Sequence, residues 1–96
     1  MILTERETEE GLLVAVCDRD VLGETFAEGD LSLTVTEEFY GGDQVDEQRV
    51  VESLSRADVA NIVGVRAVAL AVEEGFVDEA NVLEIEDTRH AQLLRM

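Results

Sequence analysis

The longest apolar stretch of the chain, Val59 to Val72, constrains its fold most strongly. A helix that crosses a lipid bilayer needs about 20 consecutive apolar residues. This stretch is shorter than that, and Asn61, Gly64 and Arg66 interrupt it. We therefore expect it to form a core helix of a folded domain, within a helical region that runs from Asp46 to Glu74.

Local signals divide this helical region into two. Asp46 suits the N-cap of a first helix, with Val50 and Leu54 on its apolar face. The segment Ser55 to Asp58 has the spacing of a capping box and would begin the second helix. A single helix with a kink fits the same residues. Gly75 stands where a left-handed C-cap is expected.

Apolar runs on both sides of the helical region predict strands. They cover residues 2–8, 11–17, 31–35, 82–85 and 91–94. A turn at Glu9-Glu10-Gly11 would join the first two into a hairpin, and Phe39 to Asp43 reads as a loop. Strands around one helical block predict a single α+β domain over residues 1–96. Its architecture would be a two-layer sandwich with helices packed on one face of a mostly antiparallel sheet.

The charge of the chain says more about its solvent than about its partners. The 96 residues include 23 Asp and Glu against seven Arg and no Lys, which gives a formal charge of −16. At 46% hydrophobic residues, the chain is too apolar for a disordered acidic tail. Acidic surfaces without Lys are typical of proteins that stay soluble in molar salt, where the Debye length is about 3 Å. We expect a haloarchaeal protein; an ordinary acidic protein without Lys is the alternative.

Several classes of protein are set aside by what the sequence lacks. Residues 1–10 hold no apolar stretch long enough for a signal peptide, which predicts a cytoplasmic protein with no membrane partner. The single Cys17 excludes an internal disulfide and a multi-cysteine zinc site. No EF-hand loop, zinc-binding helix motif or phosphate-binding loop is present. We therefore assign no metal, no cofactor and no catalytic residue.

Cys17 and His90 are the sole residues of their types, and they form the one pair that suggests nucleophilic chemistry. Cys17 ends an apolar strand, where a free cysteine usually packs. A lone histidine such as His90 more often has a structural hydrogen bond than a catalytic role. A small enzyme that uses His90 with Cys17 or Asp18 is the least favoured hypothesis.

Polar side chains in apolar surroundings provide the candidate binding residues. An Asn and an Arg inside a buried helix form either an internal network or the edge of a site where the helix meets the sheet. The C-terminal segment is rich in hydrogen-bond donors, and aromatic residues near the double glycine could stack on a base. The candidates are Tyr40, Asn61, Arg66, Arg89, His90, Gln92 and Arg95.

Motifs along the whole chain support a family resemblance. The distinctive ones are the Asn-x-x-Gly-x-Arg element at Asn61, Gly64 and Arg66 and the C-terminal His90-Ala91-Gln92 through Arg95-Met96. Weaker matches are Cys17-Asp18, Leu22-Gly23, Phe26, Glu28-Gly29, Phe39-Tyr40-Gly41-Gly42 and Glu74-Gly75. With these, the chain resembles the archaeal domain-of-unknown-function family 424. The resemblance implies a small α+β protein, described in some classifications as RNA-binding and linked to translation and ribosome genes.

Two functional hypotheses follow. The first is a non-enzymatic RNA-associated module of translation or ribosome biogenesis, with RNA or translation proteins as partners. The second is a protein-interaction module, such as a homo-oligomer that uses the uncovered sheet face or the last strand. Arg66, Arg89 and Arg95 on one face would favour RNA, whereas arginines dispersed in ion pairs would count against it.

Overall fold

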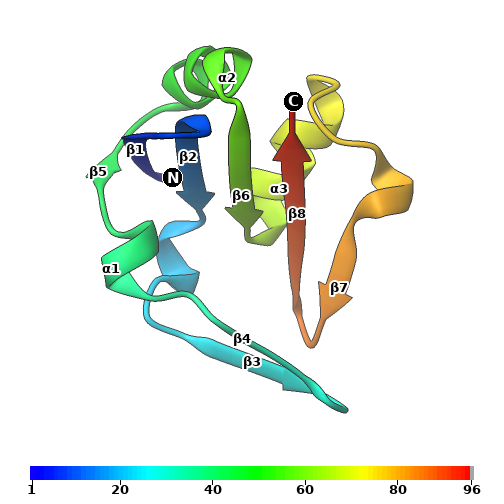
Figure 1. The fold of residues 1–96 in the computed structure, drawn as a ribbon. Helices are drawn as coiled ribbons and strands as arrows, with labels where there is room; N and C mark the ends of the chain where they lie inside the picture. Colours follow the sequence, from blue (N-terminus) through cyan, green and yellow to red (C-terminus); the bar gives the residue numbers. More distant parts are fainter. Residues whose placement is uncertain (96) are drawn as a thin grey trace.

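A six-stranded sheet forms the centre of the protein (Figure 1). The computed structural model describes residues 1–95; Met96, which belongs to the C-terminal motif of the resemblance, lies outside the described residues. The elements in chain order are β1 (Ile2–Thr8), β2 (Gly11–Cys17), η1 (Arg19–Val21), β3 (Thr25–Glu28), β4 (Leu31–Thr34), α1 (Glu37–Tyr40), β5 (Asp43–Gln44), α2 (Glu47–Arg56), β6 (Val59–Val63), α3 (Val65–Glu73), η2 (Glu79–Asn81), β7 (Leu83–Ile85) and β8 (Thr88–Leu94).

The sheet is mixed and mostly antiparallel, as the sequence predicts. Its strand order is β5-β1-β2-β6-β8-β7, and β3 and β4 form a separate two-stranded hairpin. Only β2 and β6 run parallel among these strand pairs; β1 pairs antiparallel with both β2 and β5, and β8 pairs antiparallel with both β6 and β7. The α+β class is confirmed.

The expected core helix over Val59 to Val72 is wrong in its first third. Val59–Val63 is strand β6, which lies between β2 and β8 in the centre of the sheet. Gly64 turns the chain, with φ 117°, into α3. A central strand whose side chains are largely buried has a nearly continuous apolar sequence. By periodicity alone, such a sequence cannot be distinguished from a buried helix.

The capping box expected at Ser55 to Asp58 is also absent. Ser55 lies in the last turn of α2, where its hydroxyl donates to the Glu52 carbonyl at 2.6 Å. The Asp46 N-cap of α2 is confirmed, because its Oδ1 accepts a hydrogen bond of 2.9 Å from the backbone N–H of Arg49. Gly75 has the expected left-handed conformation, with φ 80°.

Apolar side chains fill both sides of the sheet. Helices α2 and α3 cover one face, where Val50, Leu54 and Val68 pack on alternate residues of β2, β6 and β8. Part of the other face is covered by η1, the β3–β4 hairpin and α1, which pack around Cys17 and Val63. The segment expected as a loop at Phe39 to Asp43 thus contains the end of α1, whose Thr36 cap accepts from the Phe39 N–H at 3.2 Å, and β5.

Two aspartates hold the ends of the parallel pair β2–β6. At one end, Asp58 Oδ2 accepts from the Leu12 N–H at 2.8 Å, beside Gly11 with φ 106°. At the other end, the Asp18 N–H donates to the Val63 carbonyl at 3.0 Å. At each end a carboxyl group occupies the space that a side chain on a glycine would need. Asp58 does so beside Gly11, and Asp18 does so beside Gly64.

No helix within residues 1–95 is long and apolar enough to cross a membrane.

Replacement of Gly64 tests the turn between β6 and α3. An alanine Cβ at Gly64 would lie 2.7 Å from Asp18 Cβ, in a backbone conformation that L residues rarely adopt. We expect Gly64→Ala to lower the free energy of unfolding by about 3 kcal/mol or more, measured by denaturant titration in molar KCl. The matched control Gly75→Ala, with open space around it, should cost about 1 kcal/mol. Equal losses in the two variants would contradict this account of the turn.

Candidate ligand-binding cleft

A polar cleft of about 740 Å³ opens where η1 meets the N-terminus of α3. Its walls come from segments far apart in the sequence. Its lining includes Asp18, Arg19, Asp20, Glu24, Phe26, Gln44, Val65, Arg66, Asp87 and Thr88. It therefore combines carboxylates, guanidinium groups, an amide and one aromatic ring.

Asp18 builds the floor of the cleft. Its carboxylate accepts from the backbone N–H groups of Arg66 at 2.9 Å and Ala67 at 2.8 Å, which are two free donors of the first turn of α3. The positive end of the helix stabilises this charge, although Asp18 is only 7% exposed. The first of these contacts fixes the backbone of Arg66, an exposed residue that lines the cleft.

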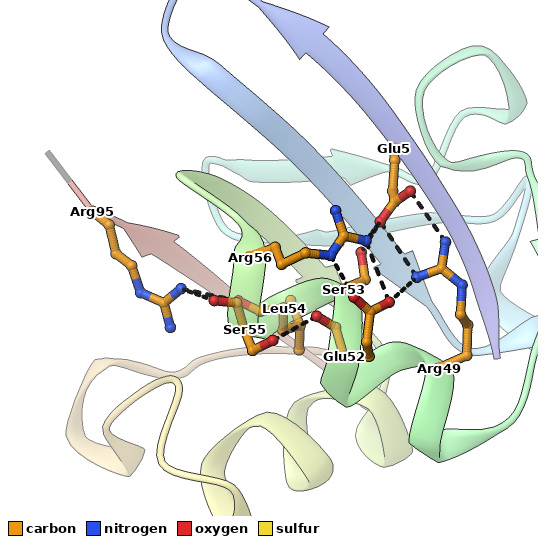
Figure 2. A network of polar contacts seen from close by, with 8 residues as sticks. All are labelled: Glu5, Arg49, Glu52, Ser53, Leu54, Ser55, Arg56 and Arg95. Atoms are coloured by element: carbon orange, nitrogen blue, oxygen red, sulfur yellow. Dashed lines mark hydrogen bonds and ion pairs between the residues drawn. The ribbon is translucent and has the colours of Figure 1, made fainter.

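Two arginines of α2 are held in an ion-pair network with Glu5 of β1 (Figure 2). Arg49 lies 3.1 Å from Glu5 and 2.7 Å from Glu52, while Arg56 lies 2.6 Å from Glu5 and also pairs with Glu52. The hydroxyl of Ser53 donates to Glu5 at 2.6 Å. The hydrogen bond from Ser53 and those from the arginines lower the Glu5 pKa from 4.5 to about 2.

Arg95, which follows the last strand, also has internal partners. Arg95 Nη1 donates to the carbonyls of Leu54 at 3.1 Å and Ser55 at 3.2 Å (Figure 2). It also donates to the Ala57 carbonyl at 3.1 Å, and these contacts together cap the C-terminus of α2. Its guanidinium also lies 5.7 Å from the ring centre of Phe76.

Arg89 and Arg6 are similarly occupied. Arg89 forms an ion pair with Glu79. Arg6 donates to the Glu38 carbonyl and lies over the Phe39 ring at 5.2 Å.

Arg19 and Arg66 are therefore the exceptions. Within residues 1–95, the guanidinium groups of the other five arginines each have a hydrogen-bond or ion-pair partner. These are Arg6, Arg49, Arg56, Arg89 and Arg95. No hydrogen bond, ion pair or aromatic contact involves the side chain of Arg19 or Arg66 in this part of the chain, and both residues line the cleft. The same cleft is lined by four carboxylates, those of Asp18, Asp20, Glu24 and Asp87, beside the two guanidinium groups.

Thr88 borders the same cleft and is 3% exposed. Its Oγ1 is inaccessible to solvent and has no hydrogen-bond partner among the described residues, although buried hydroxyl groups are normally paired. A ligand in the open cleft does not reach this atom, so the missing partner is not evidence for the site.

The remaining candidates from the sequence lie outside the cleft. Tyr40 is 5% exposed, so its ring has no free face on which a base could stack. The same burial raises its pKa to about 12. Gln92 donates to Asn61 at 3.0 Å on neighbouring strands of the sheet. His90 is half-buried, and this burial lowers its pKa.

The positive charges of the C-terminal strand do not join Arg66. Side chains alternate along β8, so the Arg89 side chain points to the face of the sheet opposite to that of His90 and Gln92. Arg95 lies just beyond β8 and reaches α2. Arg66, Arg89 and Arg95 thus do not lie on one face, and Arg49, Arg56 and Arg89 are held in ion pairs, which counts against RNA by the criterion set from the sequence.

Cys17 and His90 do not form a catalytic pair. Both flank Val63, Cys17 on β2 and His90 on β8, which places them two strands or about 10 Å apart. Cys17 is fully buried, and this burial raises the thiol pKa to about 11. The thiol therefore stays protonated and serves packing.

Sequence reasoning missed Arg19, Phe26, Gln44 and Thr88 as site residues. They lie on four different elements, and no local pattern links them. The Cys17-Asp18 and Phe26 matches in the family resemblance were the one available signal. Within residues 1–95, no group of three His, Cys, Asp or Glu side chains could hold a metal ion.

The fold and the cleft define a small, acidic α+β protein with a polar cleft at one end of its parallel strand pair. The chain belongs to the family DUF424, whose members are described as proteins of unknown function. The family model matches residues 5–96. The family expected from the sequence is thus confirmed.

A solved structure shows the same fold. The chain is similar to an uncharacterized conserved protein from Methanopyrus kandleri, with a TM-score of 0.77 and 24% identity over 99% of this chain and 93% of that one. The search of curated proteins found no match.

The lowered pKa of Glu5 predicts how the network of Figure 2 responds to acid. Its stabilising contribution is present above pH 4.5 and is lost as the pH falls to about 2. We expect Glu5→Gln to unfold about 1 kcal/mol more easily than wild type at pH 7. This difference should shrink between pH 4.5 and about 2 in denaturant titrations. Glu7→Gln, exposed on the same strand, should match wild type at every pH; a Glu5→Gln deficit that stays constant down to pH 2 would refute this origin.

Proposed function

We propose that this protein is a non-enzymatic binding module that holds a single-stranded RNA segment in the cleft. One observation supports this above all: Arg19 and Arg66, the two arginines without an internal side-chain partner within residues 1–95, line the same cleft. Guanidinium groups bind phosphates through paired hydrogen bonds and also stack on bases.

The other lining residues suit a nucleotide. Phe26 is half-buried and offers an aromatic surface on which a base can stack. Gln44 has both a donor and an acceptor for a base edge. The cleft volume of about 740 Å³ lies within the range of small-ligand sites, roughly 300–1,000 Å³. One or two nucleotides of a longer strand match this size.

The carboxylates of the cleft are compatible with RNA. Asp20, Glu24 and Asp87 accept hydrogen bonds, which base amino groups and the ribose 2′-hydroxyl can donate. In molar salt their repulsion of phosphate falls off within about 3 Å. Binding then depends on stacking and short hydrogen bonds. With two arginines on phosphates, the salt dependence of log K has a slope of about −1.4.

The place of this module in the cell follows from the family resemblance. It implies an RNA of the translation apparatus, such as ribosomal RNA, as the partner in a haloarchaeal cytoplasm. Crosslinking in native salt, followed by recovery of RNA with wild type but not with Arg66→Ala, tests this partner directly.

Removal of the two arginines tests the cleft as the RNA site. We expect Arg19→Ala and Arg66→Ala each to weaken binding of a labelled single-stranded RNA oligonucleotide about tenfold, because each loses one stacking or phosphate contact. Fluorescence anisotropy in molar KCl measures this affinity.

Arg6→Ala is the matched control, since it makes the same change of charge outside the cleft. It should bind RNA as wild type does. An equal loss in all three variants would mean that binding follows net charge and not the cleft. Wild-type protein that binds no RNA at millimolar concentration would refute the proposal.

A further inference from the structure

The β3–β4 hairpin forms one wall of the cleft, and the turn between β7 and β8 forms another. Glu24 and Phe26 line the cleft from the hairpin side, and Asp87 and Thr88 line it from the turn. In Figure 1 the hairpin lies at the bottom of the view, below the turn between β7 and β8. The way in which these two walls are joined therefore determines how open the cleft is on this side.

The hairpin has few contacts that hold it in place. Within residues 1–95 it pairs with no strand of the six-stranded sheet. Each of its strands has four residues, of which one is half-buried and three are exposed. A two-stranded hairpin on its own is at best marginally stable in water. Its position at the cleft thus depends on the points where it is attached.

The first attachment lies at the base of the hairpin. The Gly23 N–H donates to the Val35 carbonyl at 2.7 Å, and the Val35 N–H donates to the Glu24 carbonyl at 2.9 Å. Val35 is fully buried in the cluster around Cys17. These hydrogen bonds fix the base and leave the far end of the hairpin unconstrained.

Two glutamates attach the far end of the hairpin to the β7–β8 turn. Glu86 Oε1 accepts from the Ala27 N–H at 2.6 Å, and Glu28 Oε1 accepts from the Glu86 N–H at 2.8 Å. We call this reciprocal pair of hydrogen bonds the hairpin contact. It joins two segments that lie 58 and 59 residues apart in the chain.

The backbone of the turn has an unusual conformation at the hairpin contact. Ile85 pairs with Thr88, so Glu86 and Asp87 form a two-residue turn. Glu86 has φ 53° and is the one non-glycine residue with a positive φ within residues 1–95. Such turns favour glycine, asparagine or aspartate at this position, because the conformation is costly for other L residues. Since both the N–H and the carboxylate of Glu86 are used in the hairpin contact, the residue at this position serves the contact and not the turn.

Like charges meet at the hairpin contact. The hairpin carries Glu28 and Asp30, and the turn carries Glu86 and Asp87. No ion pair within residues 1–95 involves any of these four carboxylates. Electrostatic repulsion reaches over about 30 Å at 0.01 M salt but only about 3 Å at 1 M salt. Repulsion between the two segments is therefore screened in molar salt and grows as the salt concentration falls.

The positive groups near this contact do not cancel the repulsion. Arg89 is held in its ion pair with Glu79. Arg19 and Arg66 line the same cleft and form no ion pair within residues 1–95. Their two charges are outnumbered by the carboxylates of the hairpin and the turn, which belong to Glu24, Glu28, Asp30, Glu86 and Asp87.

We propose that the β3–β4 hairpin is a movable wall of the cleft, which the hairpin contact holds closed in molar salt and releases as the salt concentration falls. On release the hairpin swings about its base at Gly23 and Val35, and Phe26 moves away from the turn that carries Asp87. The movement opens the cleft for whichever ligand it takes, so this proposal does not depend on RNA as the ligand.

Amide hydrogen exchange of the ligand-free protein, followed by NMR, tests the movable wall. The Ala27 and Glu86 N–H groups should exchange about fivefold faster in about 0.1 M KCl than in about 1 M KCl, because the Debye length rises from about 3 to about 10 Å. Exchange at the Val35 N–H, at the base, should stay as in molar salt. An unchanged rate at Ala27 and Glu86 would overturn the proposal. An equal rise at Val35 would also overturn it, because the domain and not the hairpin would then be opening.

Two substitutions of the exposed Glu28 separate its acceptor oxygen from its charge. Glu28→Ala removes the acceptor, so the Glu86 N–H should exchange about tenfold faster than in wild type even in molar KCl. Glu28→Gln keeps an acceptor oxygen without the charge. It should keep the protection of wild type in molar KCl and lose most of the dependence on salt.

Asp30→Ala is the matched control, because Asp30 is an exposed carboxylate of the same hairpin outside the hairpin contact. The Glu86 N–H should exchange in this variant as in wild type in molar KCl. Wild-type exchange in Glu28→Ala would overturn the hairpin contact as the attachment. A Glu28→Gln variant as sensitive to salt as wild type would overturn repulsion between carboxylates as the cause of release.

Discussion

The Asp18 carboxylate holds together the junction of β2, β6 and α3 on which the cleft depends. It accepts the first free N–H groups of α3 from Arg66 and Ala67, while the Asp18 backbone pairs with β6. Only a glycine at position 64 leaves room for this carboxyl group. A buried charge is normally costly, but here two hydrogen bonds and the helix N-terminus stabilise it. Arg66, whose backbone N–H takes part in this junction, lines the cleft together with Arg19, so the fold and the candidate site share one interaction.

The strong acidity of the chain makes its exceptions informative. Most of the arginines serve the fold: Arg49 and Arg56 join α2 to β1, and Arg95 caps α2. Arg19 and Arg66 have no such role in residues 1–95 and lie in the cleft.

Local features could be predicted from the sequence, whereas long-range ones could not. The β1–β2 hairpin and the Asp46 cap were predictable because neighbouring residues determine them. Strand β6 was not, because a largely buried strand in the centre of a sheet gives a nearly continuous apolar run, which periodicity cannot distinguish from a buried helix. Family membership was within reach of the sequence. The ion pair of Arg89 and the position of Arg19 in the cleft were not, because both depend on how separate elements meet.

Amide hydrogen exchange in Asp18→Asn tests the central junction most directly. An asparagine keeps the shape but has one acceptor oxygen for two N–H donors. We expect faster exchange at the Arg66 and Ala67 amides and a loss of about 1–3 kcal/mol in the free energy of unfolding. Asp20→Asn, which changes the exposed neighbouring carboxylate, should leave both quantities as in wild type. Unchanged exchange at Arg66 and Ala67 in Asp18→Asn would contradict the account.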